Sequence, residues 1–212
     1  MKTSLKTLIA TTMTAIVLAT TVQTSAAAEK IKMVGSATAN PDIKKIIVTG
    51  NTKVLLVQSN KEYVTMEDEM IDKVSVKQEG NALTISSSEK SPVTVTVYVK
   101  NPFRIDASGT SVVNTVGKFN VKDLQILLKD DAKARVKAQT ESLYSVVNNQ
   151  AALELLGSTG THIIKSEGLG KLNVEKFAAL KTDREIPMTE VARNTEEVAD
   201  NVAIASHRVN KK

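Results

Sequence analysis

The pattern that decides the fold is contained in residues 124–136, LQILLKDDAKARV. Two segments meet at Asp130, and beyond it Ala132, Ala134 and Val136 alternate with basic residues. Alternation with a period of two is typical of a β-strand with one buried face. Asp fits the junction, because it accepts the left-handed backbone conformation that turns require. The stretch therefore predicts a strand, a turn and a second strand.

This arrangement recurs along the chain at nearly equal intervals, with a period of about 20 residues, which is typical of a solenoid coil. Equivalent turns fall at Gly109, Asp130, Asn149 and Gly168. The residues six before each turn are Phe103, Leu124, Leu143 and His162, and those four before are Ile105, Ile126, Ser145 and Ile164. Two alternating segments per repeat are what each coil of a parallel β-helix needs, since inward residues pack under those of the next coil. We expect Ile126, Leu153, Leu155 and Leu172 to point inward.

The preceding region, from Lys44 to Val99, consists of short β-branched runs separated by turn residues. Val93, Val95, Val97 and Val99 fall on one face of a strand. Glu79-Gly80-Asn81 predicts a hairpin turn between two such runs. We therefore expect an all-β fold with an N-terminal β-hairpin region followed by a short parallel β-helix. An antiparallel β-sandwich, which also gives closely spaced short strands, stays the alternative.

Five short segments within residues 43–180 carry a resemblance to a known family. They are IVTGN (47–51), VLLVQS (54–59), LTI (83–85), VYVKNP (97–102) and IDASG (105–109). In this order they resemble landmarks of the bacterial head GIN domain family, also described as "putative auto-transporter adhesin". The resemblance implies a signal peptide followed by a compact right-handed β-helix in an exported protein. The chain departs from the pattern where Asp130-Asp131 and Asn148-Asn149 replace the Ser-Gly of the first turn.

The segment 1–28 has the three parts of a secretory signal peptide. A basic start, Met1 to Lys6, precedes the apolar stretch from Leu8 to Val22, and Ala26-x-Ala28 provides a cleavage site for signal peptidase. About 15 residues span only about 22 Å of helix, which is shorter than a hydrocarbon core of about 30 Å. We predict that the mature chain begins at Glu29, keeps no membrane span, and lies in the periplasm, on the cell surface or outside the cell.

Composition excludes several classes of protein. The chain has no Cys, which rules out disulfides, thiolate chemistry and attachment of a lipoprotein anchor. Without the segment 1–28, 26 basic and 23 acidic side chains remain, and they are interspersed. Since aromatic residues make up only 3% of the chain, a nucleic-acid partner is not expected. Two His residues and no metal-ligand spacing give no reason to expect a metal or another cofactor.

The composition changes again at the C-terminus, over residues 181–212, which contain no Gly and no aromatic residue. Thr189 after Pro187 resembles a helix N-cap, and Val191, Val198 and Val202 form a thin apolar stripe. We expect either a helix within 187–207 that covers the last coil or a solvated polar tail. The predicted division is thus a signal peptide (1–28), one β-rich domain (29–180) and this C-terminal segment (181–212).

No residue is assigned a catalytic, cofactor-binding or metal-binding role from the sequence. His162 occupies a position filled by Phe or Leu in other repeats, so it is interpreted as structural, and His207 falls in the polar segment. The other candidates have simpler interpretations, which are a solvated loop for Glu67-Asp68-Glu69, a turn for Ser108, turn hydrogen bonds for Asp130-Asp131, and a surface ion pair for Arg135, flanked by Asn114 and Glu154.

These observations favour a non-catalytic envelope or surface protein with a possible role in adhesion or binding. We expect an unidentified protein or glycan partner, bound on a strand face or an exposed edge, and the edges could also support self-association. The alternative is a carbohydrate-active β-helix enzyme, a polysaccharide lyase or hydrolase, which would need paired carboxylates or a base beside a calcium cluster.

Overall fold

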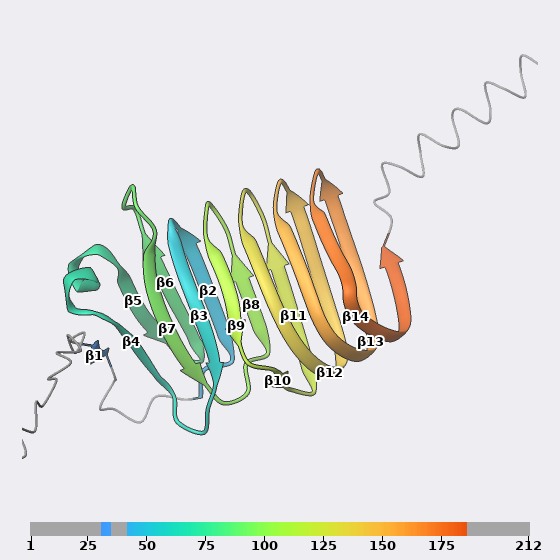
Figure 1. Ribbon diagram of the computed structural model, residues 1–212, viewed down its shortest axis with the longest axis horizontal. Coiled ribbons are helices and arrows are strands. Elements are labelled where there is room, and N and C mark those ends of the chain that lie inside the picture. The colour runs from blue at the N-terminus through green and yellow to red at the C-terminus, as the bar shows by residue number, and fades with distance from the viewer. Residues whose placement is uncertain (1–30, 35–41, 186–212) are drawn as a thin grey trace, which may run out of the picture.

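The computed structural model describes residues 31–34 and 42–185, and these are almost entirely β-structure (Figure 1). Strands make up 71% of this part, and one curled mixed sheet contains them. The single short helix in the described ranges, η1, is a 3₁₀ helix over Asp68–Lys73 with no buried residue.

The strands of the first half are β1 (Ile31–Val34), β2 (Lys45–Gly50), β3 (Thr52–Gln58), β4 (Tyr63–Glu67), β5 (Ser75–Glu79), β6 (Ala82–Ser87) and β7 (Val93–Val99). Those of the second half are β8 (Arg104–Ala107), β9 (Val112–Val116), β10 (Phe119–Asn120), β11 (Asp123–Leu128), β12 (Lys133–Asn149), β13 (Ala152–Gly168) and β14 (Lys171–Glu185). The second half therefore ends in three long strands that pair side by side.

Two arms of the sheet face each other across one core (Figure 1). The β3 arm consists of β4, β7, β3 and β9, and the β2 arm consists of β5, β6, β2, β8 and β11. The beginning of β12 pairs with β9 and its end pairs with β11. The long strands thus run through both arms and join them.

Strand register confirms the predicted repeat from Leu124 onwards, whereas Phe103, the first residue of that series, is exposed. Leu124 pairs with Leu143 and Leu143 with His162, while Ile126 lies between Ile105 and Ser145. The predicted turn residues all have positive φ, with 70° at Gly109, 62° at Asp130, 58° at Asn149 and 76° at Gly168. The turns therefore lie in one column at the ends of successive parallel strands.

Asp130 ties three of these turns together. Its Oδ2 accepts a hydrogen bond of 3.1 Å from the backbone N–H of Gly109, and its Oδ1 accepts one of 3.1 Å from Nδ2 of Asn149. The carboxylate thus satisfies donors in the turn before and the turn after its own. The interpretation of Asp130 as a hydrogen-bonding turn residue agrees with this geometry, although its backbone partner lies in the preceding turn rather than locally.

The alternation of polarity becomes an alternation of burial. Ile126, Leu153 and Leu155 are at most 1% exposed, as predicted, whereas Lys133 lies on the outer face. Leu172 points inward too but is only partly buried, because β14 is the last described strand of the stack. Each inward residue therefore depends on the strand above it and the strand below it.

The all-β part of the prediction is confirmed, but the sheet is mixed. The ladders β2–β8, β3–β9, β8–β11, β11–β12, β12–β13 and β13–β14 are parallel, whereas β1–β4, β4–β7 and β5–β6 are antiparallel. Neither a wholly parallel β-helix nor an antiparallel sandwich describes such a sheet. The hairpin at Gly80 is confirmed, since Glu79 pairs with Ala82.

The expectation of an N-terminal hairpin region is otherwise wrong for β2 and β3, because these two strands do not pair with each other. These strands follow each other through Gly50 but pair in different arms, β2 with β6 and β8, and β3 with β7 and β9. At the other end, β14 continues to Glu185, beyond the expected boundary at 180. The predicted cleavage site at 28 and the predicted helix within 187–207 lie outside the described residues.

Candidate functional site

A groove of about 360 Å³ lies on the outer face of the β2 arm. Its lining comes from neighbouring strands and the turns that follow them, and consists of Lys45, Ile47, Thr49, Arg104, Asp106, Ala107, Ser108, Leu127, Leu128, Lys129, Val146 and Asn148. We call this the β2-arm groove. Because side chains alternate along each strand, the residues between the buried ones point out into it.

A row of paired residues crosses the floor of the groove. Ile47 pairs with Asp106, Asp106 with Leu127, and Leu127 with Val146. All of them are partly exposed on the outer face. The row is thus apolar on both sides of one carboxylate.

Asp106 is held between two cations. Its Oδ2 lies 3.0 Å from Nζ of Lys45, and its Oδ1 accepts a hydrogen bond of 2.8 Å from Nε of Arg104. The side chains of Lys45 and Arg104 are 35% and 34% exposed, against 20% for Asp106. Among the described residues, the hydrogen bond from Nε to Asp106 is the only one that the Arg104 side chain donates. A guanidinium edge therefore remains available at the groove.

The other end of the groove carries neutral polar groups and one more lysine. Thr49, Ser108 and Asn148 line it beside Lys129. Oδ1 of Asn148 is buried and accepts no hydrogen bond from any described group. A buried acceptor without a donor costs about 1–3 kcal/mol. Because this oxygen has almost no accessible surface, the cost lies within the fold and the atom is not a contact point for a ligand.

A second groove, of about 500 Å³, lies on the outer face of the β3 arm and contains Arg135. Arg135 pairs in register with Asn114 on one side and Glu154 on the other, as the sequence predicts. Its Nε is 3.5 Å from Oε2 of Glu154, and the two side chains are 58% and 37% exposed. Such an exposed ion pair contributes less than about 1 kcal/mol.

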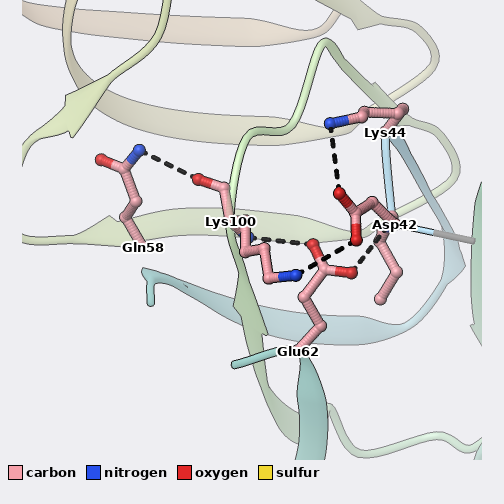
Figure 2. Close-up of polar contacts among 6 residues, drawn as sticks. Asp42, Lys44, Gln58, Glu62 and Lys100 are labelled. Atoms are coloured by element: carbon pink, nitrogen blue, oxygen red, sulfur yellow. Dashed lines mark hydrogen bonds and ion pairs between the residues drawn. The ribbon is translucent and has the colours of Figure 1, made fainter. Parts of the chain in front are cut away.

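A charged cluster near the start of β2 is closed on itself (Figure 2). Glu62 accepts hydrogen bonds of 2.8 Å and 3.0 Å from the backbone N–H groups of Ile43 and Lys100. Asp42 lies 3.2 Å from Nζ of Lys100 and 3.9 Å from Nζ of Lys44. The carboxylates thus fasten the chain before β2 to the loop after β7. Their engagement makes this cluster a bracing element of the fold rather than a ligand site.

Gln58 extends this bracing to a third loop. Its Nε2 donates to the carbonyl oxygens of Lys100 and Asn120, each at 3.0 Å, and its Oε1 accepts a hydrogen bond of 2.8 Å from the N–H of Asn120 (Figure 2 shows the bond to Lys100). The side-chain amide is therefore fully used. A shallow polar hollow beside it, lined by Gln58, Ser59, Asn60, Lys100 and Asn101, offers little apolar contact.

His162 is a core residue, in agreement with the structural interpretation. It is 1% exposed, its Nε2 lies 2.8 Å from Oγ of Ser145, and the ring of Phe177 meets it edge-on at 5.5 Å between centroids. Burial first, and Arg184 second, lower the pKa of His162 to about 4. A serine beside a histidine is also the beginning of a nucleophile–base pair. Here both side chains are enclosed by the core, so no substrate reaches them.

The remaining sequence candidates are dispersed. Glu67 ends β4, and Asp68 and Glu69 open η1 rather than a loop, fully on the surface. Ser108 is a turn residue whose N–H donates to the carbonyl of Val48, and it also lines the β2-arm groove. Within the described ranges no group of His, Asp and Glu is arranged to hold a metal ion. His207 lies outside those ranges.

Sequence reasoning missed the β2-arm groove because its floor residues look like core residues. Ile47, Leu127 and Val146 stand in apolar runs, IIV, ILL and VV, in which either neighbour could face inward. The signal that could have exposed them is the alignment of repeats, which places Leu127 and Val146 beside Asp106 in one outward row. An apolar residue aligned with a carboxylate is a poor candidate for the core.

The structure is thus that of an all-β protein with a groove on one outer face of its sheet. A family model described as "Putative auto-transporter adhesin, head GIN domain" matches residues 42–186. The chain belongs to this family, as the resemblance in its sequence predicts.

Solved structures share the fold. The crystal structure of a "putative adhesin" from Bacteroides fragilis superimposes with a TM-score of 0.59 at 16% identity, covering 74% of this chain and 76% of that one. A "Putative lipid binding protein" from Parabacteroides distasonis gives a TM-score of 0.54 at 13% identity, covering 73% and 77%. No curated protein sequence matches the chain. None of the described residues forms a helix long and apolar enough to cross a membrane.

Proposed function

We propose that this protein is a non-catalytic, exported binding module of the cell envelope or surface, and that it holds its partner in the β2-arm groove. The observation that carries the proposal is the groove itself, in which apolar, cationic and hydroxyl-bearing side chains converge on one outer sheet face. Convergent polar groups over an apolar floor are the usual features of a ligand site.

Family membership and the shared fold support a surface role. The family bears the description "Putative auto-transporter adhesin", and the neighbouring structures bear the descriptions "putative adhesin" and "Putative lipid binding protein". We infer export from the signal-peptide pattern of residues 1–28, and intact-mass measurement of native material tests it. A mature mass that begins at Glu29 is expected, whereas retention of residues 1–28 would contradict export by cleavage.

Binding rather than catalysis is proposed because the groove contains one carboxylate, Asp106, which is already engaged by Lys45 and Arg104. Glycoside hydrolysis usually needs two carboxyl groups separated by about 5–10 Å.

We further infer that the repeat from β8 to β14 is a short right-handed β-helix, a proposal supported by its parallel ladders.

The proposal is tested with the mature chain against a glycan panel and phospholipid vesicles. Leu127→Asp places a charge on the groove floor, and Leu55→Asp makes the same change at a partly exposed, outward residue of β3 in the other arm. Both variants are first compared with the parent in thermal melts.

We expect at least one probe to bind the parent and the Leu55→Asp variant but to lose affinity for the Leu127→Asp variant. Equal binding by both folded variants, or no binding to any probe, would overturn the groove as the site. Turnover of an acidic polysaccharide that disappears on replacing a single carboxylate would instead support the enzyme alternative.

A further inference from the structure

We propose that the β2-arm groove binds a sugar that carries a carboxylate, such as a uronic or sialic acid within a glycan. This inference rests on the proposed function and specifies its ligand. It follows from three features of the groove, namely its excess positive charge, its neutral polar end and the interruption of its apolar floor.

The first feature is charge. Lys45, Arg104 and Lys129 line the groove against the single carboxylate of Asp106, so two positive charges are not neutralised there. Arg104 binds Asp106 through Nε alone, which leaves its terminal amino groups for a second planar anion. Arg recognises carboxylates through such paired donors, and these charge-assisted bonds are stronger than neutral ones.

The second feature is the set of neutral polar groups at the other end. Thr49 and Ser108 line this part of the groove beside Asn148. A sugar ring presents hydroxyl groups that both donate and accept, so one ring can exchange hydrogen bonds with a serine and a threonine hydroxyl. A plain carboxylic acid or an inorganic anion offers no such donor.

The third feature argues against an acyl chain. Asp106 stands in the floor row between Ile47 and Leu127. A hydrocarbon chain lying along that row would cover the carboxylate without hydrogen-bonding to it, and desolvating a charge in this way is unfavourable. A sugar can place its C–H face on Leu127 and Val146 and turn a hydroxyl towards Asp106.

The size of the groove also suits a short glycan segment. Its volume of about 360 Å³ falls at the lower end of the usual range for ligand sites, about 300–1,000 Å³. The groove runs across several strands of one outer face, so a chain of sugars can enter and leave along the surface.

The test compares ligands that differ only in the acid group. Calorimetry with the mature chain measures sialyllactose against lactose, and oligogalacturonate against its methyl ester. We expect at least one acidic member to bind about tenfold more tightly than its neutral counterpart at low salt, with the preference shrinking as salt rises.

Variants then locate the site. Arg104→Gln is expected to remove most of the preference for the acid, and Lys129→Gln to reduce affinity about threefold without affecting the fold, because Lys129 is exposed. Lys137→Gln, which removes an exposed lysine from the outer face of the β3 arm, is the matched control. Its affinity should equal that of the parent.

Acidic and neutral ligands that bind equally, or a loss of binding in the Lys137→Gln variant as large as in Lys129→Gln, would overturn the inference. Vesicle or protein binding that is lost in the Leu127→Asp variant, without any preference for acidic sugars, would refute the ligand class while leaving the proposed function intact. Failure of every probe would refute both.

Discussion

The early and late parts of the sheet reach the same packing by different routes. In the late part, β12, β13 and β14 pair with strands that are their immediate neighbours along the chain, so Leu143 meets His162 of the very next repeat. In the early part, Ile46 of β2 pairs with Leu83 and Ile105, and several other strands separate it from both along the chain. The inward side chains of β2 and β3 are as fully buried as those of β12 and most of those of β13, whereas β14 contains no buried residue. A closed core therefore does not require that strands paired in the sheet also follow each other along the chain.

The turns show the same contrast. Gly50 of the early part leaves no space, since a Cβ there would lie 2.0 Å from the carbonyl oxygen of Ser87. The late turns instead carry Asp130 and Asn149, which keep positive φ and use their side chains to join successive turns. The contrast is confined to these turn positions, because the late strand β13 has a glycine of its own, Gly157, where a Cβ would lie 2.0 Å from the carbonyl oxygen of Ala138.

The largest expected effect tests whether the two parts are truly equal in burial. Val54 and Leu153 occupy one inward row, linked through Val113 and Ala134. Replacing either with Asp buries an unpaired carboxylate, and we expect a loss of about 4 kcal/mol in the free energy of unfolding. Lys133→Asp, on the outer face, should change it by less than about 0.5 kcal/mol. Urea denaturation measures all three, and a late part that tolerates Leu153→Asp as well as Lys133→Asp would refute the inward assignment.

The second test concerns the turns. Gly50→Asn should cost about 2–3 kcal/mol, because the backbone must move to relieve contact with Ser87. Asn149→Gly keeps the conformation and loses one side-chain hydrogen bond to Asp130, so about 0.5–1 kcal/mol is expected. Thermal melts at one pH rank the two variants. A Gly50→Asn variant as stable as the parent would remove the distinction between early and late turns.

The third test uses the pH dependence of the late part. A folded pKa of about 4 for His162, below the unfolded value of about 6.5, means that the folded state disfavours the protonated ring. The stability that depends on the neutral ring is fully present above pH 6.5 and is lost as the pH falls towards 4. We expect a loss of about 2 kcal/mol, less than the whole shift implies, because β14, the strand that covers His162 on one side, is itself largely exposed.

The double variant Ser145→Ala, His162→Leu removes both members of the buried pair and continues the row of Leu124 and Leu143. Its stability between pH 6.5 and pH 4 should fall less than that of the parent by this amount. Chemical denaturation across that range provides the comparison. An identical pH dependence in parent and variant would show that other groups control it.

The smallest effect is expected at the exposed pair Arg135 and Glu154. A double-mutant cycle with Arg135→Gln and Glu154→Gln should give a coupling energy below about 1 kcal/mol that decreases with salt. A larger coupling would mean that this ion pair contributes substantially to stability despite its exposure.

Prediction from sequence succeeded where the chain repeats and failed where it does not. The late turns, and the inward positions of Ile126, Leu153 and Leu155, could be predicted because equal spacing places equivalent residues in register. The placement of β2 and β3 in different arms could not be predicted, since no local signal distinguishes a hairpin from a turn between two arms. The groove was hidden because Ile47 and Leu127 are apolar yet outward, and only their alignment with Asp106 reveals the face they share.

The long-range pairing of β2 also affects the order in which the protein can fold. Closing the long segment between Ile46 and Ile105 costs more chain entropy than closing the much shorter one between Leu143 and His162. The late strands can therefore form a nucleus from local contacts, and the early strands must add to it afterwards. Synthesis runs in the opposite direction, from β2 towards β14. The part of the chain that is made first is thus the part that waits longest for its full set of partners, because β2 and β3 can pair with β6 and β7 but keep one open edge each until β8 and β9 have been added.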